Sequence, residues 1–206
     1  LLMEHVKSLL DIDTVEVADT VKSFCELWQS RSNRYPFYTL GKSAYLDGGT
    51  LSYYKDSLWL NEILISNFDD VYSKLLSYLS EELKEKVKLS KDLALPGFHI
   101  FPSDPKFLSM SGNWHMDHPH VTLGLGESDP YAFTLPIQLP VSGGGMDWLN
   151  EVGLSSHLAY TEGEIVLHSG LTPHRIAGIK KYTPGEYRIT LQGHLIRRDN
   201  TMEVFW

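Results

Sequence analysis

The sequence changes character at Pro96-Gly97, and this change constrains the fold more than any other feature. Beyond it, short stretches of β-branched and aromatic residues alternate with Gly, Pro, Asp and Ser, a pattern typical of antiparallel barrels and sandwiches. About eight strands are expected, near residues 97–101, 112–117, 120–125, 131–139, 157–160, 164–168, 174–179 and 186–197. That number suits a jelly-roll barrel.

The residues before Pro96 have a mainly helical pattern. Asp13 can cap a helix, with Glu16 completing a capping box, and apolar residues then recur at helical spacing from Val17 to Trp28. A short β-like piece is expected over residues 37–46. A second helix is expected to open at Asn67, with an apolar face formed by Val71, Tyr72, Leu75, Leu76, Leu79 and Leu83.

We therefore expect a fold that is mainly β with flanking helices (α+β), in a single domain covering residues 1–206. Residues 1–95 would form a mainly helical buttress, and residues 96–206 would form the β-barrel. A chain of 206 residues, of which 42% are hydrophobic, is long enough to bury one substantial core.

The charge and the cysteine content narrow the possible partners and compartments. A formal net charge of −8 disfavours nucleic acid, and the pairs Lys180-Lys181 and Arg197-Arg198 are expected to be ordinary surface residues. The lone Cys25 excludes an internal disulfide, and we expect it to be buried among apolar neighbours. No apolar run is long enough for a bilayer, and residues 1–4 lack the features of a signal peptide. We expect a soluble, cytoplasmic protein with no membrane partner, whose native start is missing.

His115 and Asp117 form the first half of a candidate metal site. On a strand, side chains two residues apart point the same way, so an imidazole and a carboxylate would project together from one side of the sheet. His174, at the start of a later strand, is a candidate third ligand. Two histidines and one carboxylate on one face of an iron leave the opposite positions open.

Arg188 and Thr190 strengthen this interpretation. They lie two residues apart on the last long strand, so a guanidinium and a hydroxyl share one face. A guanidinium can bind a carboxylate through two parallel hydrogen bonds, and the hydroxyl can add a third. The pair therefore provides an anchor for a dicarboxylate.

These residues resemble the motifs of the Fe(II)- and 2-oxoglutarate-dependent oxygenases, which have a double-stranded β-helix fold. The resemblance rests on His115-Met116-Asp117, on the strand from Gly163 to Leu167 that leads to His174, and on Arg188-Ile189-Thr190. It covers about the C-terminal half of the chain and identifies no subfamily.

The resemblance implies that His115, Asp117 and His174 bind Fe(II), and that Arg188 and Thr190 bind the far carboxylate of the cosubstrate 2-oxoglutarate. In this family O2, the second cosubstrate, converts 2-oxoglutarate to succinate and CO2 while a substrate is oxidised, usually by hydroxylation. The expected function is oxidation of a small molecule, such as an amino acid or a natural-product intermediate, with no catalytic residue beyond the metal centre. Asp117 argues against halogenation, whereas desaturation, ring formation and epimerisation stay open.

Several alternatives stay open at this point. His168 is a rival to His174 as third ligand, while His118 and His120 are expected in a loop or on the outer face. His99 could point towards the cosubstrate, but a structural role is the favoured interpretation. The substrate pocket is not assigned, although it could include Trp114, Tyr131, Phe133, Gln138, Trp148 or Arg197.

Two other functions fit the same residues. One is a cupin-like metal-binding protein or sensor that does not use 2-oxoglutarate, and the other is a protein hydroxylase. The glycines after Ser142 are expected to form a simple connection, because no phosphate-loop lysine follows them. The oligomeric state is open, including whether the N-terminal helices pair with a second copy.

Overall fold

A computed structural model of the chain describes residues 5–31, 36–109, 111–126 and 129–206. Within these residues, a nine-stranded sheet dominates the fold and a three-stranded sheet faces it. The main path of the large sheet is β1 (Val6–Leu9), β9 (Glu164–Ser169), β6 (Tyr131–Gln138), β11 (Tyr187–Arg198), β5 (Gly97–Pro102), β3 (Tyr38–Leu40) and β2 (Gln29–Ser30). β12 (Thr201–Phe205) pairs with β11 and with β4 (Val87–Leu89). The small sheet contains β10 (His174–Ile176), β7 (Met146–Leu149) and β8 (Ser155–Leu158).

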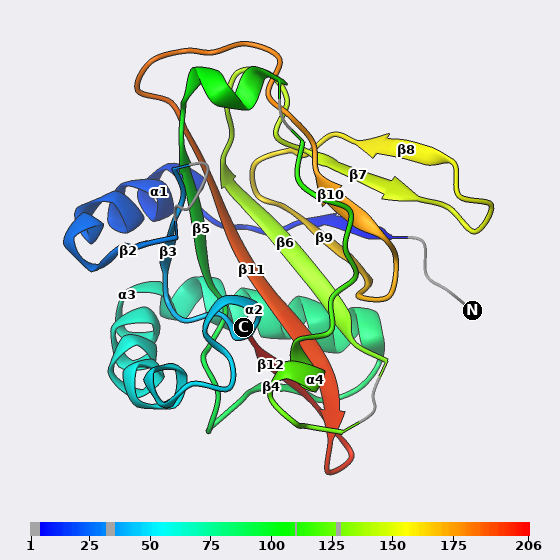
Figure 1. Cartoon of the computed structure of the whole chain (residues 1–206). Coiled ribbons are helices and arrows are strands. Elements are labelled where there is room, and N and C mark those ends of the chain that lie inside the picture. The colour runs from blue at the N-terminus through cyan, green and yellow to red at the C-terminus, as the bar shows by residue number, and fades with distance from the viewer. Residues whose placement is uncertain (1–4, 32–35, 110, 127–128) are drawn as a thin grey trace.

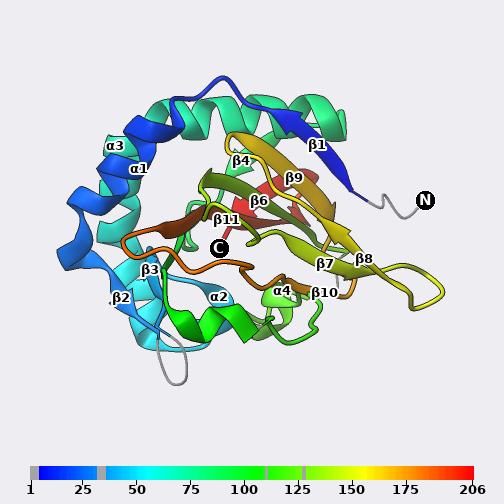
Figure 2. The ribbon, with the colours of Figure 1, turned by 90° about the horizontal axis from the view of Figure 1, so that it is seen from above.

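The helices lie outside this pair of sheets. Figure 1 shows the long strands β5, β6 and β11 side by side, with β7, β8 and β10 to one side of them. Seen from above in Figure 2, α1 (Thr14–Ser23) and α3 (Leu51–Leu83) wrap around the side of the large sheet that faces away from β7, β8 and β10. The predicted class, mainly β with flanking helices, is confirmed.

The N-terminal helices differ from prediction in their extent. Asp13 caps α1 by accepting from the backbone amides of Val15 and Glu16, at 3.1 and 3.0 Å. The predicted start of the second helix at Asn67 is wrong, because α3 begins at Leu51 with Thr50 as its cap. The helix does break its regular geometry next to Asn67, at Phe68, whose φ is −130°.

Other predicted boundaries are also corrected. The piece over residues 37–46 contains β3, but its second part enters α2 (Ala44–Asp47). Residues 120–125 begin in α4 (Pro119–Thr122), where a proline at the first helical position favours a helix. Residues 112–117 form a loop in which only His115 makes a β-bridge. Cys25 is exposed and not buried, because α1 ends at Ser23 and a 3-10 turn (Cys25–Leu27) follows.

Five strands of the described residues were absent from the prediction, namely β1, β2, β4, β7 and β12. The remaining short element is the 3-10 turn Pro105–Ser109. None of the helices in the described ranges has the length and apolarity that a membrane span requires. The N-terminal residues 1–4, from which the absence of a signal peptide was predicted, lie outside those ranges.

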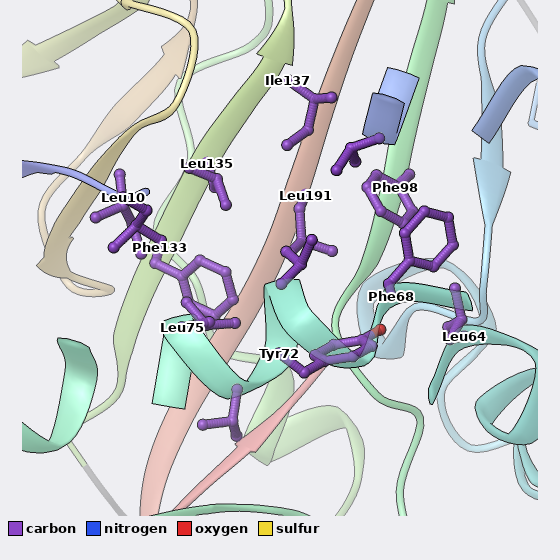
Figure 3. Packing of buried hydrophobic residues seen from close by; sticks show 14 of the residues in the cluster. Leu10, Leu64, Phe68, Tyr72, Leu75, Phe98, Phe133, Leu135, Ile137 and Leu191 are labelled. Atoms are coloured by element: carbon purple, nitrogen blue, oxygen red, sulfur yellow. The ribbon is translucent and has the colours of Figure 1, made fainter. Parts of the chain in front are cut away.

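The hydrophobic core lies between the large sheet and the helices. Figure 3 shows Phe68, Tyr72 and Leu75 of α3 against side chains from the central strands. The strand side chains in this cluster include Phe98, Ile100, Phe133, Leu135, Ile137, Ile189, Leu191 and Leu195. Because side chains alternate across a strand, the intervening residues point to the other face, toward the small sheet.

Candidate metal centre

A cavity of about 480 Å³ lies between the two sheets. Its wall includes strand residues that alternate with the core residues. They are His99 of β5, Ala132 and Thr134 of β6, His168 of β9, and Arg188, Gln192 and His194 of β11. The loop before α4 and strand β10 supply His115, Asp117 and His174 to the same cavity. The fold therefore brings the predicted metal ligands and Arg188 to one cavity.

Backbone hydrogen bonds hold His115 beside His174. The amide of His115 donates to the carbonyl of His174 at 3.0 Å, and the amide of His174 donates back at 2.9 Å. The amide of Asp117 donates to the carbonyl of Gly170 at 2.7 Å, which ties the carboxylate to the turn after β9. Residues 112–117 do not form the regular strand that was predicted. The backbone bridge between His115 and His174 holds these two side chains together instead.

The three side chains converge. Nε2 of His174 lies 3.4 Å from Oδ2 of Asp117, and Nε2 of His115 lies 4.0 Å from Oδ1. One donor atom from each residue lies within 4.8 Å of the others. Two donor atoms that bind one metal at about 2 Å lie no more than about 4 Å apart, so the 3.4 and 4.0 Å separations are compatible with a single ion.

Hydrogen bonds also select the tautomers of the two histidines. Nδ1 of His115 lies 2.8 Å from the carbonyl of Asn113, and Nδ1 of His174 lies 2.8 Å from the carbonyl of Thr172. A carbonyl can only accept, so each Nδ1 carries the hydrogen. This leaves the lone pair on Nε2, the atom that faces Asp117, where a metal would need it.

Asp117 is suited to be an anionic ligand. Burial alone would raise the pKa of its carboxyl, but the surrounding histidines outweigh that effect and bring the pKa below its usual value. In decreasing order of influence, these histidines are His194, His174, His168 and His115. The carboxyl is therefore ionised at neutral pH.

His168 lies in the cavity but outside the group of three. Its ring centroid is 4.7 Å from that of His174, and its Nδ1 lies 2.8 Å from the carbonyl of Ser169. Burial lowers the pKa of His168 to about 4, so its ring is neutral. The structure groups His174, and not His168, with His115 and Asp117.

Arg188 and Thr190 are both buried on the cavity side of β11. Nε of Arg188 donates to the carbonyl of Gly144 at 2.8 Å, and Nη1 lies 3.4 Å from Oγ1 of Thr190. The guanidinium also lies 5.6 Å from the ring of Phe101 and 5.7 Å from the ring of Tyr160. In the described part of the chain, no carboxylate oxygen forms an ion pair with Arg188 within 4.0 Å.

A buried charge without a counterion is costly, and burial lowers the pKa of Arg188 below its usual value. An anion bound beside Arg188 and Thr190 would remove that cost. The glycine turn also has a role beyond the predicted connection, because the Gly144 carbonyl orients the guanidinium and the residue's φ of 77° disfavours a side chain there.

His194 is the main residue that the sequence analysis missed. It follows Arg188, Thr190 and Gln192 along the same face of β11, so the two-residue period could have indicated it. Its Nδ1 is buried, has no hydrogen-bond partner within the described ranges, and lies 4.0 Å from Oδ2 of Asp117.

Two further residues at the cavity complete its polar wall. The hydroxyl of Tyr45 lies 2.6 Å from Nε2 of His99, and both residues line the cavity. His99 therefore faces the cavity, in addition to any structural role. His118 is exposed, as predicted for a loop residue, whereas His120 is buried.

The six residues that could form the substrate pocket differ in their positions. Phe133 borders the cavity although it also belongs to the helix-side core. Trp114 does not border the cavity, but its ring centroid lies 4.4 Å from the guanidinium of Arg175, which does. The others do not contribute to the wall of this cavity; they are Tyr131, Gln138, Trp148 and Arg197.

Comparison with known proteins identifies the fold. No protein-family model matches the sequence, and no curated protein matches it. An N-substituted L-amino acid dioxygenase from Burkholderia ambifaria, solved in complex with alpha-KG, matches with a TM-score of 0.64 and 14% identity over 98% of this chain and 86% of that chain. A 2OG-Fe(II) oxygenase family protein from Burkholderia pseudomallei matches with a TM-score of 0.56 and 10% identity, over 91% and 83% of the two chains.

A third similar structure is the non-heme alpha ketoglutarate dependent epimerase SnoN from nogalamycin biosynthesis. Its TM-score is 0.56 with 11% identity, over 94% of this chain and 81% of that chain. At such low identity these matches establish the fold: the chain has the double-stranded β-helix fold of the 2-oxoglutarate-dependent oxygenases. The resemblance inferred from the sequence motifs is confirmed at this level.

Proposed function

We propose that the chain is a non-haem Fe(II)/2-oxoglutarate-dependent dioxygenase. His115, Asp117 and His174 would hold the iron, because they place two imidazole nitrogens and one carboxylate within 4.8 Å of one another. Their position at one wall of the cavity leaves the other side of the ion open to ligands. When bound, the iron and 2-oxoglutarate supply the oxidising chemistry with O2, and succinate and CO2 are the co-products.

The observation that carries this proposal is the unpaired guanidinium of Arg188 in the same cavity as the three ligands. Arg188 and Thr190 would bind the far carboxylate of 2-oxoglutarate, which is the counterion that the buried cation lacks. Gly144 holds the guanidinium in place through Nε, and Nη1 points to Oγ1 of Thr190, the hydroxyl that would share the carboxylate. A cupin-like protein that does not use 2-oxoglutarate has no need for this cation.

The substrate that we propose is a small molecule, such as an amino acid or a natural-product intermediate. The dioxygenase from Burkholderia ambifaria acts on an N-substituted L-amino acid, and SnoN belongs to nogalamycin biosynthesis. Retention of Asp117 favours hydroxylation or a related oxidation over halogenation. A protein hydroxylase is the less favoured enzyme, and a cytoplasmic location stays a prediction.

Discrimination between two keto acids tests the proposal directly. Pyruvate has the metal-chelating end of 2-oxoglutarate but lacks the far carboxylate. In calorimetric titrations of the Mn(II)-loaded chain, we expect 2-oxoglutarate to bind about 100-fold more tightly than pyruvate. Arg188→Met should abolish this preference and leave Mn(II) binding intact. Equal affinity of the two keto acids for the unaltered chain would contradict the proposed cosubstrate.

A further inference from the structure

The first half of α3, before the irregular residue Phe68, carries a line of exposed apolar side chains. They are Leu51, Tyr54, Leu58 and Ile65, with exposed fractions of 89, 42, 64 and 43%. We call them the outer stripe. The opposite side of the same helix is fully packed, since Tyr53, Leu60 and Leu64 are buried. The outer stripe therefore contributes nothing to the core of its own chain.

The spacing of the outer stripe is that of a helix–helix contact. Leu51, Leu58 and Ile65 recur every seven residues, and Tyr54 follows Leu51 by three. Side chains at these steps lie along one side of a helix and can pack against a second helix. Single exposed apolar residues are common on protein surfaces, whereas neighbouring ones that form a continuous apolar surface are typical of interaction sites.

Two charged residues beside the outer stripe indicate which partner fits it. Lys55 and Glu62 are both exposed, lie seven residues apart on one side of the outer stripe, and form no ion pair within the described part of the chain. If two copies of the helix pack antiparallel with Leu58 near the two-fold axis, Lys55 lies beside the partner's Glu62. The two-fold axis then creates a second, identical pair. A parallel arrangement would instead bring each charged residue level with the identical residue of the partner.

We propose that the chain forms a symmetric dimer through the outer stripe, with the two α3 helices antiparallel. In this dimer Leu58 faces the partner's Leu58, and Leu51 faces the partner's Ile65. The same surface is used by both copies, as a two-fold interface requires. This inference concerns a surface outside the metal centre and does not depend on the proposed function.

Cysteine crosslinking tests the antiparallel register. The native cysteine, Cys25, is exposed, so it is first replaced by serine. Under mild oxidation Leu58→Cys should give a covalent dimer, because identical residues meet only near the two-fold axis. Leu51→Cys alone should not crosslink, whereas Leu51→Cys combined with Ile65→Cys should. Val152→Cys, at a site that is 77% exposed on another surface, is the matched control.

Sedimentation velocity tests the same interface without oxidation. Lys55→Glu and Glu62→Lys should each weaken the dimer by about tenfold, because each places like charges together at both symmetric pairs. The double variant should recover the original dissociation constant to within about threefold. Leu58→Glu should give a monomer, and Val152→Glu should not change the assembly.

The two experiments have clear contrary outcomes. A chain that is monomeric at about 100 μM, or a Leu58→Cys crosslink no stronger than that of Val152→Cys, would overturn the dimer. Equal crosslinking of Leu51→Cys alone would overturn the antiparallel register. Circular dichroism will show whether Leu58→Glu is folded. If it is not, the Lys55→Glu, Glu62→Lys and double variants still test the dimer, because both residues are exposed.

Discussion

The two faces of the central strands carry side chains of opposite character. On the helix side, β11 presents Ile189, Leu191 and Leu195, all of them buried in the hydrophobic cluster. On the cavity side, the same strand presents Arg188 and His194, which are also buried. Because neighbouring residues on a strand point to opposite faces, one strand supplies both sets.

The two faces differ in whether their buried side chains find partners within the chain. The helix-side residues pack against α3, and their contribution is to the stability of the fold. Within the residues that the structure describes, the cavity side includes the cation of Arg188, which forms no ion pair, and the Nδ1 atoms of His99 and His194, which have no hydrogen-bond partner. Groups of this kind cost stability unless a ligand pairs with them. The cavity face is therefore arranged for binding at the expense of stability.

The largest expected effect is on the helix side. Leu191→Ala should lower the free energy of unfolding by about 2–5 kcal/mol, because it leaves a cavity in the packed cluster. Chemical denaturation measures this change, with Val141→Ala, at a residue that is 73% exposed, as the control. The folded variant should bind Mn(II) and 2-oxoglutarate as before. A loss below about 1 kcal/mol would mean that the two faces differ less in packing than we infer.

A pH effect is expected from His99 on the cavity side. Burial, followed by the charges of Arg188 and Arg31, lowers the pKa of His99 to about 3 in the folded chain. Below pH 6.5 the unfolded chain binds a proton at this ring that the folded chain does not. Stability should therefore fall as the pH drops from 6.5 toward 3, by about 2 kcal/mol between pH 7 and pH 5.

Two variants separate this contribution from others. His99→Gln should make the dependence of the unfolding free energy on pH shallower over this range. Tyr45→Phe removes the hydrogen-bond partner of His99 but keeps the ring, so it should keep the dependence. An unchanged pH profile in His99→Gln would contradict a buried, neutral His99.

Removing the cavity-side cation should have a smaller effect on stability. Arg188→Met deletes a buried charge that has no counterion among the described residues, so the free energy of unfolding should stay equal or rise by about 1 kcal/mol. Urea denaturation in the absence of metal and 2-oxoglutarate measures it. A loss of more than about 2 kcal/mol would show that Arg188 is a structural residue and not a group held ready for a ligand.

The smallest expected effect is that of replacing His168, the histidine that lies beside His174. His168→Gln should change the affinity for Mn(II) by less than about threefold, whereas His174→Gln should reduce it by about 100-fold. Titration of each variant with Mn(II), followed by electron paramagnetic resonance, measures the difference. A larger effect from His168 would make it the third ligand in place of His174.

The sequence was sufficient to predict the main features of the fold and the three side chains that converge in the cavity. The long strands β6, β9 and β11 have strong β-branched and aromatic patterns bounded by turn residues, and their predicted ranges agree with the structure to within about two residues. The His-x-Asp spacing and Arg188-x-Thr190 indicated side chains that the structure brings to one cavity, and their roles as ligands stay predictions. The ligand choice between His168 and His174 could not be made from local pattern, because both residues lie at a strand end.

The remaining differences have physical causes that local patterns do not contain. β1 is a strand because it pairs with β9, more than 150 residues away, and not because of its own composition. Residues 112–117 were expected to be a strand, yet His115 is held by one bridge to His174. The approach of His194 to Asp117 depends on how the loop before α4 crosses β11, which only the tertiary structure fixes.

The central claim is that the cavity face holds a metal and 2-oxoglutarate together. Anaerobic titration of the Fe(II)-loaded chain with 2-oxoglutarate tests it most directly, because chelation of iron by the keto acid produces a visible absorption band. We expect the band in the unaltered chain and in Leu191→Ala, its loss in His174→Ala, and a need for about 100-fold more 2-oxoglutarate in Arg188→Met. A band of equal strength in His174→Ala, or no band in the unaltered chain at saturating 2-oxoglutarate, would contradict the claim.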